Sequence, residues 1–270
     1  MLATSNRQCL SRGLLSAERA KQSAYKQYLS TETAITIVHN DIVRAIDAGN
    51  ISALVVLDLS AAFDTVDRDV LLDVLSKWFG VASNAFDWCK LRLSERTQSF
   101  CVTSGTSNSV KLTCSIPQGS MIGPVKCIAY TEEIVETVDA FRINHHFYAD
   151  DTLLQDHMRT DTIQANRPNL ELCIDAIKEW CSSLRLQLNG DKTEIIWFGS
   201  RANLKKLSSA DTTLRIGSTI VEPVNSVRNL GVYMASELSM RTHIDKVSSA
   251  CFYHLCRLRL PRYAVSESTM

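Results

Sequence analysis

The feature that most constrains the fold is a short apolar run that ends on an acid. Residues 51–57 (ISALVVL) are rich in β-branched and aliphatic side chains. This composition is typical of a strand that is buried on both faces. Asp58 follows directly, so its charge is predicted to lie at the edge of the sheet. A hard cation could hold a carboxylate at such an edge, although an Asp after a strand can equally cap the next helix.

A second acidic feature is the adjacent pair Asp150 and Asp151. Strand-like segments on either side of residues 149–152 (ADDT) predict a tight hairpin with both acids at its tip. Neighbouring carboxylates repel and raise each other's proton affinity unless a cation neutralises them. Two Mg²⁺ ions held by such carboxylates can activate a hydroxyl and stabilise a leaving oxygen in phosphoryl transfer. Alone, however, an Asp-Asp pair in a turn is typical of solvent-facing turn chemistry.

The rest of the chain mixes helical and extended patterns. Helices are predicted from the N-cap Ser30 to Gly49, over 66–78, over 84–93, after Gly119, over 170–184 and over 240–259. Further strands are predicted at 97–103 and 109–114 around a turn at 104–108, at 193–198, at 215–221 and at 226–234. Helices combined with hairpins indicate an α+β fold with helices on one face of the sheet.

Composition excludes several classes of protein. Apolar residues make up 45% of 270, which is enough for a sizeable core. The nine cysteines are odd in number and scattered, with no CxxC pair, so buried thiols in a reducing intracellular setting are expected rather than disulfides or a zinc site. No apolar run reaches membrane-spanning length, and residues 1–22 contain no apolar signal core. The net charge is zero, but the C-terminal stretch is basic and could meet phosphates or form a solvated helix face.

Five segments, taken in order, resemble the palm motifs of non-LTR retrotransposon reverse transcriptases, especially jockey-like and other LINE-type elements. They are residues 58–67 (DLSAAFDTVD), 116–120 (IPQGS), 147–152 (FYADDT), 188–194 (LNGDKTE) and 227–232 (VRNLGV). The resemblance covers roughly residues 22–260. It implies an RNA-directed DNA polymerase with an antiparallel palm sheet backed by helices, partial fingers and a truncated thumb.

The resemblance also implies a metal site. Asp58, Asp150 and Asp151 would be the ligands of two Mg²⁺ ions, with Mn²⁺ as an alternative, and Leu59 would add its backbone carbonyl. Lys192 would act as a general acid or electrostatic stabiliser for the leaving pyrophosphate. Without the family, a Lys in a polar turn is simply a solvated charge.

Other matched positions would contact the substrates: an RNA template, a DNA primer and a deoxynucleoside triphosphate. Phe63 would be the steric gate against a ribose 2′-hydroxyl, although a Phe after a strand is ordinarily a core residue. Gln118 and Gly119 would lie against the incoming nucleotide. The primer and template positions would be Tyr148, Asn229, Leu230 and Gly231, and residues 22–26 resemble the fingers segment that contacts template.

The implied organisation is an unassigned segment 1–21, a fingers and palm domain 22–234, and a thumb stub 235–270. One departure is Arg68, where the family commonly has His. A rival interpretation is a catalytically inactive remnant that acts at most as an RNA- or partner-binding palm. An RNA-templated RNA polymerase is disfavoured by the bulky Phe63. The oligomeric state, the compartment and the insertion target are left open.

Overall fold

The computed structural model describes residues 22–60, 65–103, 105–116, 123–131, 133–207 and 211–259. Phe63, Gln118 and Gly119 lie outside the described residues, as does the segment 1–21. The expectations for these positions therefore stay predictions.

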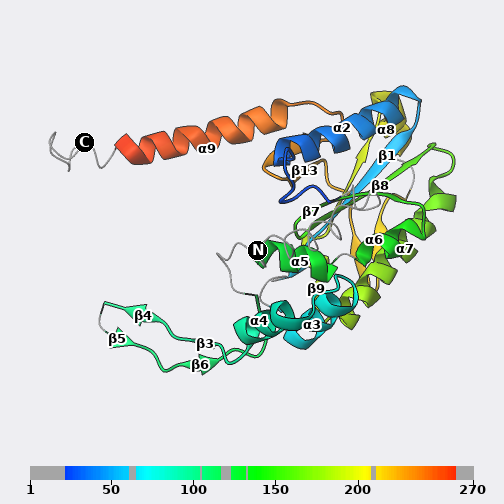
Figure 1. Ribbon diagram of the computed structural model, residues 1–270. Helices are drawn as coiled ribbons and strands as arrows, with labels where there is room; N and C mark the ends of the chain where they lie inside the picture. The colour runs from blue at the N-terminus through cyan, green and yellow to red at the C-terminus, as the bar shows by residue number, and fades with distance from the viewer. Residues whose placement is uncertain are drawn as a thin grey trace.

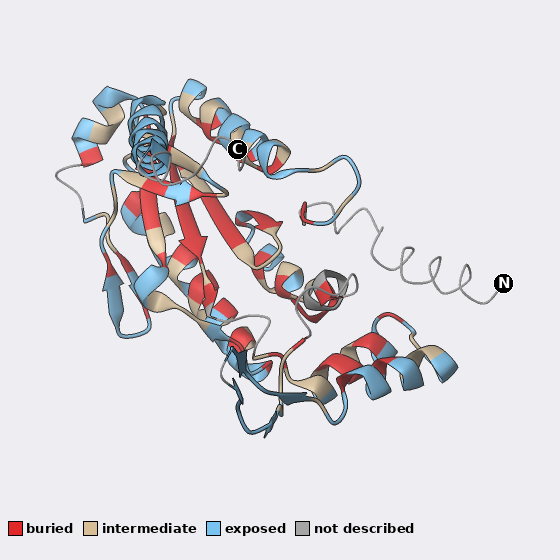
Figure 2. Cartoon of the chain, turned by 90° about the vertical axis from the view of Figure 1, so that its left-hand side faces the viewer, coloured by how far each residue is buried: buried red, intermediate tan, exposed pale blue. Residues whose placement is uncertain are grey.

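The centre of the molecule is a four-stranded antiparallel sheet in the order β10-β1-β8-β7. Its strands are β1 (Ile51–Leu57), β7 (Asn144–Tyr148), β8 (Asp151–Met158) and β10 (Glu194–Phe198). Every residue of β1 is buried, which confirms the predicted strand with two covered faces. Figure 2 shows the buried residues concentrated in these strands.

Two apolar clusters cover the two faces of β1. Ile51, Ala53, Val55 and Leu57 belong to the larger cluster, whereas Leu54 and Val56 belong to the smaller one, as the period of two in a strand requires. The larger cluster is closed by helices that include α3 (Arg68–Lys77), α6 (Ile134–Asp139) and α7 (Ile163–Ser183). The smaller cluster is closed by α2 (Thr31–Asp47) with β13 (Ser226–Asn229) and β14 (Val232–Ala235). Helices therefore lie on both faces, because α2 covers the face that was expected to lack them (Figure 1).

Local signals place most helix ends where the sequence predicts them. The Ser30 hydroxyl accepts a hydrogen bond from the N–H of Thr33, and Thr33 Oγ1 accepts one from the N–H of Ser30, so α2 begins with a reciprocal capping box. Asp67 caps α3 through the N–H groups of Asp69 and Val70. The helix α7 begins at Ile163, earlier than its apolar pattern predicts, and continues across Pro168.

The remaining elements surround this core. They are β2 (Leu59–Ser60), α4 (Ser83–Leu93), α5 (Gly123–Thr131), β9 (Gln187–Leu188), the 3₁₀ turn η2 (Gly190–Lys192), α8 (Arg201–Leu207), β11 (Leu214–Ile216) and β12 (Thr219–Val221).

The predicted hairpin over 97–114 exists, but its strands are much shorter than expected. It consists of β3 (Thr97–Gln98) paired with β6 (Val110–Lys111), and β4 (Cys101–Val102) paired with β5 (Gly105–Thr106). All four strands are exposed, and the tip lies between β4 and β5 rather than at 104–108. None of these strands has a buried face that would fix the register. The prediction rested on the turn residues alone, and it therefore placed the tip wrongly.

The last described helix, α9 (Arg241–Arg259), has no buried residue and extends away from the sheet (Figure 1). Within the described part of the chain, no helix combines the length and apolar character that crossing a membrane requires.

Candidate active site

The β7–β8 hairpin brings two of the three predicted acids to the end of β1. Tyr148 pairs with Asp151, so only Ala149 and Asp150 form the turn, and Ala149 adopts a left-handed conformation with φ of 56°. On the other side of β8, Leu57 pairs with Thr152. The next pair along this antiparallel register is Asp58 and Asp151, which places the two carboxylates on adjacent strand ends.

The environment at this edge of the sheet disfavours the ionised form of the carboxyl groups. Burial raises the pKa of Asp151 to about 6, and the negative charges of Asp150 and Asp58 add to the shift. Burial also raises the pKa of Glu194, the first residue of β10. A carboxylate held in this environment binds a cation favourably, because the cation removes the repulsion.

Asp58 and Asp151 open into one polar cleft of about 420 Å³. Lys192, at the end of η2, reaches into the same cleft and places its Nζ 3.2 Å from Asp58 Oδ2. The backbone N–H of Asn189 donates to the Asp58 carbonyl at 2.9 Å, which fixes η2 against the end of β1. The other lining residues are Val56, Asp191, Glu194, Arg228, Asn229 and Leu230.

The β13–β14 turn lines the same cleft. Asn229 pairs with Val232, and the two turn residues Leu230 and Gly231 have positive φ angles of 46° and 86°. This is a two-residue hairpin turn, which requires left-handed backbone at both central positions. Asn229 is buried, and its side-chain oxygen accepts no hydrogen bond from the described residues.

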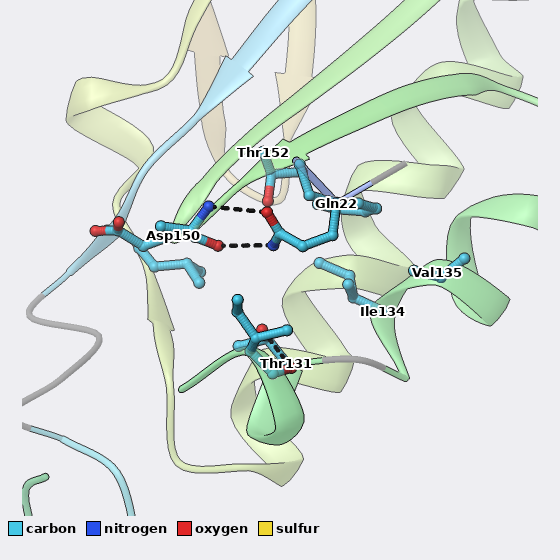
Figure 3. Close-up of a pocket in the computed structure, with 10 residues that line it drawn as sticks. Gln22, Thr131, Ile134, Val135, Asp150 and Thr152 are labelled. Atoms are coloured by element: carbon cyan, nitrogen blue, oxygen red, sulfur yellow. Dashed lines mark hydrogen bonds between the residues drawn. The ribbon is translucent and has the colours of Figure 1, made fainter. Parts of the chain in front are cut away.

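Gln22 holds the β7–β8 turn through its side-chain amide (Figure 3). Its Nε2 donates to the carbonyl of Ala149 at 3.3 Å, and its Oε1 accepts from the N–H of Ala149 at 3.1 Å. The N–H of Ala24 also donates to Oε1, at 3.0 Å, which orients the amide. Ser23 adds a backbone bond to Phe147 and a side-chain bond to His146. The segment therefore pairs with β7 and its turn, and its expected contact with the template stays a prediction.

The acids fit a divalent cation only in an open arrangement. Asp150 lines a small pocket of about 30 Å³ beside Gln22, whereas Asp58 and Asp151 line the larger cleft. Among the described residues, no three His, Cys, Asp or Glu side chains are grouped so that they could hold a metal ion together. Two carboxylates with open positions suit Mg²⁺, which commonly keeps water and substrate phosphates among its ligands.

The structure brings most of the predicted site residues together. Asp58, Asp151, Lys192, Asn229 and Leu230 line one cleft, with Asp150 and Gly231 at the adjoining turns. Leu59 is buried in β2, where it pairs with Leu188, and Tyr148 is half-buried opposite Asp151.

Sequence reasoning missed some residues that the structure adds. Asp191, Glu194 and Arg228 lie within quoted motifs but were given no role. Glu194 lies in the cleft because β10 pairs with β1 so that Glu194 stands opposite Val56, a register that the folded structure shows. The clamp by Gln22 acts across 127 positions, and no local pattern predicts it.

Sequence comparison decides the family. The model of the family described as reverse transcriptase (RNA-dependent DNA polymerase) matches residues 9–234. The chain belongs to the reverse transcriptase family. Its sequence is also 23% identical, over 88% of the chain, to a Drosophila melanogaster protein described as a probable RNA-directed DNA polymerase from transposon BS. The family match confirms the reverse transcriptase expected from the motifs.

Solved structures agree with this reverse transcriptase fold. The apo telomerase of Candida tropicalis, truncated from its C-terminal domain, superposes with a TM-score of 0.59 at 12% identity, over 88% of this chain and 44% of that chain. The telomerase of Candida albicans, in complex with a fragment of telomeric RNA, gives a TM-score of 0.57 at 14% identity, over 87% and 37%. The α+β palm is therefore confirmed. The chain spans 26% of the length of the transposon relative.

Proposed function

We propose that this reverse transcriptase chain carries the polymerase site of a retrotransposon and extends a DNA primer on an RNA template. The observation that carries the proposal is the convergence of Asp58, Asp151 and Lys192 with the β13–β14 turn in one cleft. The acids come from segments almost a hundred residues apart, and a solvent-facing turn would not require β1 to end beside it. The family as a whole uses divalent metal ions, and we assign them here to Asp58, Asp150 and Asp151.

In this mechanism the chain positions the reactants and contributes little covalent chemistry. The bound ions would polarise the primer 3′-hydroxyl and the phosphate oxygens of the deoxynucleoside triphosphate. The attack forms one P–O bond at the α-phosphorus and breaks the bond to pyrophosphate. Lys192, whose Nζ lies 3.2 Å from Asp58 Oδ2, would neutralise or protonate the leaving pyrophosphate.

The β13–β14 turn, which lines the same cleft as the acids, would support the primer. Leu230 and Gly231 form the rigid two-residue turn of β13–β14, and the buried Asn229 oxygen has no hydrogen-bond donor among the described residues. Phe63, Gln118 and Gly119 keep their assigned roles as steric gate and nucleotide contacts. The RNA bound in the Candida albicans telomerase structure supports an RNA template for the same fold.

Primer extension tests the proposal. The protein is incubated with poly-rA, oligo-dT, dTTP and Mg²⁺, and is compared with Asp150→Asn and with the control Asp47→Asn on the exposed end of α2. Extension by the parent chain and the control, but not by Asp150→Asn, supports the polymerase. A folded parent chain that binds RNA and extends nothing would favour the inactive remnant.

A further inference from the structure

Three arginines gather at the base of the exposed hairpin, away from the acidic cleft. Arg68 is the first residue of α3, Arg92 lies in the last turn of α4, and Arg96 immediately precedes β3. Arg96 and Arg68 both bond the returning side of the hairpin: the carbonyl of Arg96 accepts from the N–H of Leu112 at 2.8 Å, and Arg68 donates to the carbonyl of Cys114 at 3.1 Å. The charges of Arg68 and Arg92 both act on Arg96.

No carboxylate of the described residues neutralises the positive charge of this cluster. Among the described residues, none of the three arginines has a carboxylate within ion-pair distance, and the neighbouring Asp67 pairs with Arg185 instead. Arg68 Nε and Arg96 Nη1 are buried donors without an acceptor in the described part of the chain. Burial, together with the positive charges of Arg68 and Arg92, lowers the pKa of Arg96. Buried guanidinium donors ordinarily have hydrogen-bond acceptors, so an anion bound beside Arg68 and Arg96 would supply the acceptors that the described residues do not provide.

The cluster opens to solvent beside an aromatic side chain. Arg92 and Arg96 line a cleft of about 460 Å³ together with Trp88 and Leu91 from α4. Trp88 is 48% exposed and Leu91 is 77% exposed. Guanidinium groups beside an exposed indole are the combination that binds a single nucleic-acid strand, since arginines take the phosphates and the ring takes a base.

We propose that the cleft of Arg92, Arg96 and Trp88, with Arg68 beside it, binds the phosphodiester backbone of a single nucleic-acid strand, and that Trp88 stacks on a base. The strand is the unpaired template, so the inference rests on the proposed polymerase function. Arg68 stands where the family commonly has His, and it adds to the site a charge that does not depend on pH. A strand is favoured over a free nucleotide because the cleft is open and is lined by exposed side chains of α4.

The test is the salt dependence of binding to a fluorescent single-stranded RNA, measured by polarisation at several KCl concentrations. Each phosphate contact contributes about 0.7 to the slope of log K against log salt on a single strand. The double variant Arg92→Gln/Arg96→Gln should lower that slope by about 1.4, because it removes two such contacts. The matched control Arg159→Gln/Arg215→Gln removes the same charge from the residue that follows β8 and from β11, and it should leave the slope unchanged.

A second pair of measurements separates binding from folding. Trp88→Leu should weaken binding about tenfold with the salt slope retained, because it removes stacking and no charge. Arg96→Gln should leave the melting temperature unchanged or raise it, since it relieves repulsion. A slope equal in the arginine variant and its control, or a marked loss of melting temperature in Arg96→Gln, would overturn the site. The site would also be refuted if these arginines govern binding of dTTP but not of RNA.

These assays measure equilibrium binding, so their outcome is independent of primer extension. A chain that extends primers but shows no change in slope would lose this site and keep the proposed function. A chain that shows the change in slope but extends no primer would keep the site and lose the function.

Discussion

Asp151 is the residue whose environment differs most from that of an ordinary surface carboxyl. It begins β8, is partly buried, and lies beside both other acids. Its elevated pKa is a cost to the folded protein whenever the group is ionised, and a bound cation would remove that cost. The site is therefore less stable without an ion than with one, which is a property expected of a metal centre.

This environment predicts a pH dependence of stability in EDTA. The pKa of Asp151 rises from 3.8 to about 6, so between these values the folded protein binds more protons than the unfolded chain. The stability that protonation provides is present at low pH and is lost as the pH rises through about 6. Asp151→Asn stays neutral, so its melting temperature relative to the parent chain should climb between pH 4 and 6 and then level off. Mg²⁺ should reduce this difference in melting temperature at about pH 7, because it neutralises the ionised carboxyl. A difference in melting temperature that does not change with pH would contradict the raised pKa of Asp151.

Gln22 supplies a second prediction at the scale of one residue. Replacing it with Met keeps the side-chain length but removes the hydrogen bonds to Ala149 and Ala24. A net value of about 0.5–1.5 kcal/mol for each of the three bonds predicts a loss of about 1.5–4.5 kcal/mol in the free energy of unfolding. We also expect primer extension to slow about tenfold and the Mg²⁺ midpoint to rise, because the turn that carries Asp150 loosens and misplaces its carboxylate.

The matched control is Gln164→Met, which removes an exposed bond to the carbonyl of Asp211. The control should change neither the Mg²⁺ midpoint nor the extension rate. If Gln22→Met lowers stability but leaves the Mg²⁺ midpoint where it was, Gln22 is structural only.

Among the elements, the β13–β14 hairpin shows how backbone conformation shapes the cleft. Gly231 has a φ of 86°, and a Cβ added there would meet no atom within 4 Å, so a substitution is limited by conformation and not by space. Gly231→Ala should cost about 1 kcal/mol in urea unfolding and displace Leu230 from the cleft. Gly190→Ala, at a glycine without positive φ, should be close to neutral. Equal costs for the two variants would show that the turn is not held in this conformation.

The sequence predicts elements well where a local pattern and a buried face coincide. The run 51–57 could be placed because both of its faces are covered, and Ser30 could be placed because its capping box is local. The tip of the hairpin over 97–114 was predicted wrongly because its strands are exposed and no buried face fixes their register. The site acids were found through motif resemblance, whereas the clamp by Gln22 and the cleft beside Trp88 depend on pairings that only the folded chain creates.

At the scale of the whole molecule, one central strand organises the site. β1 lies between β8 and β10, so its C-terminal end meets the β7–β8 turn on one side and the start of β10 on the other. On the second face of the sheet, Val227 and Met234 of β13–β14 pack with α2 and β1, which positions the turn that lines the cleft. The polar cleft therefore depends on the same packing that stabilises the fold.

The most direct test of the central claim is a titration of the protein with Mn²⁺, followed by electron paramagnetic resonance, because it requires no catalysis. The account predicts saturable binding that Asp151→Asn weakens at least about tenfold, as loss of a charged ligand implies, and that Asp47→Asn leaves unchanged. Binding should also weaken below about pH 6, where Asp151 takes up a proton. Equal Mn²⁺ affinity in the parent chain and Asp151→Asn would contradict the assignment of this cleft as the metal site of the polymerase.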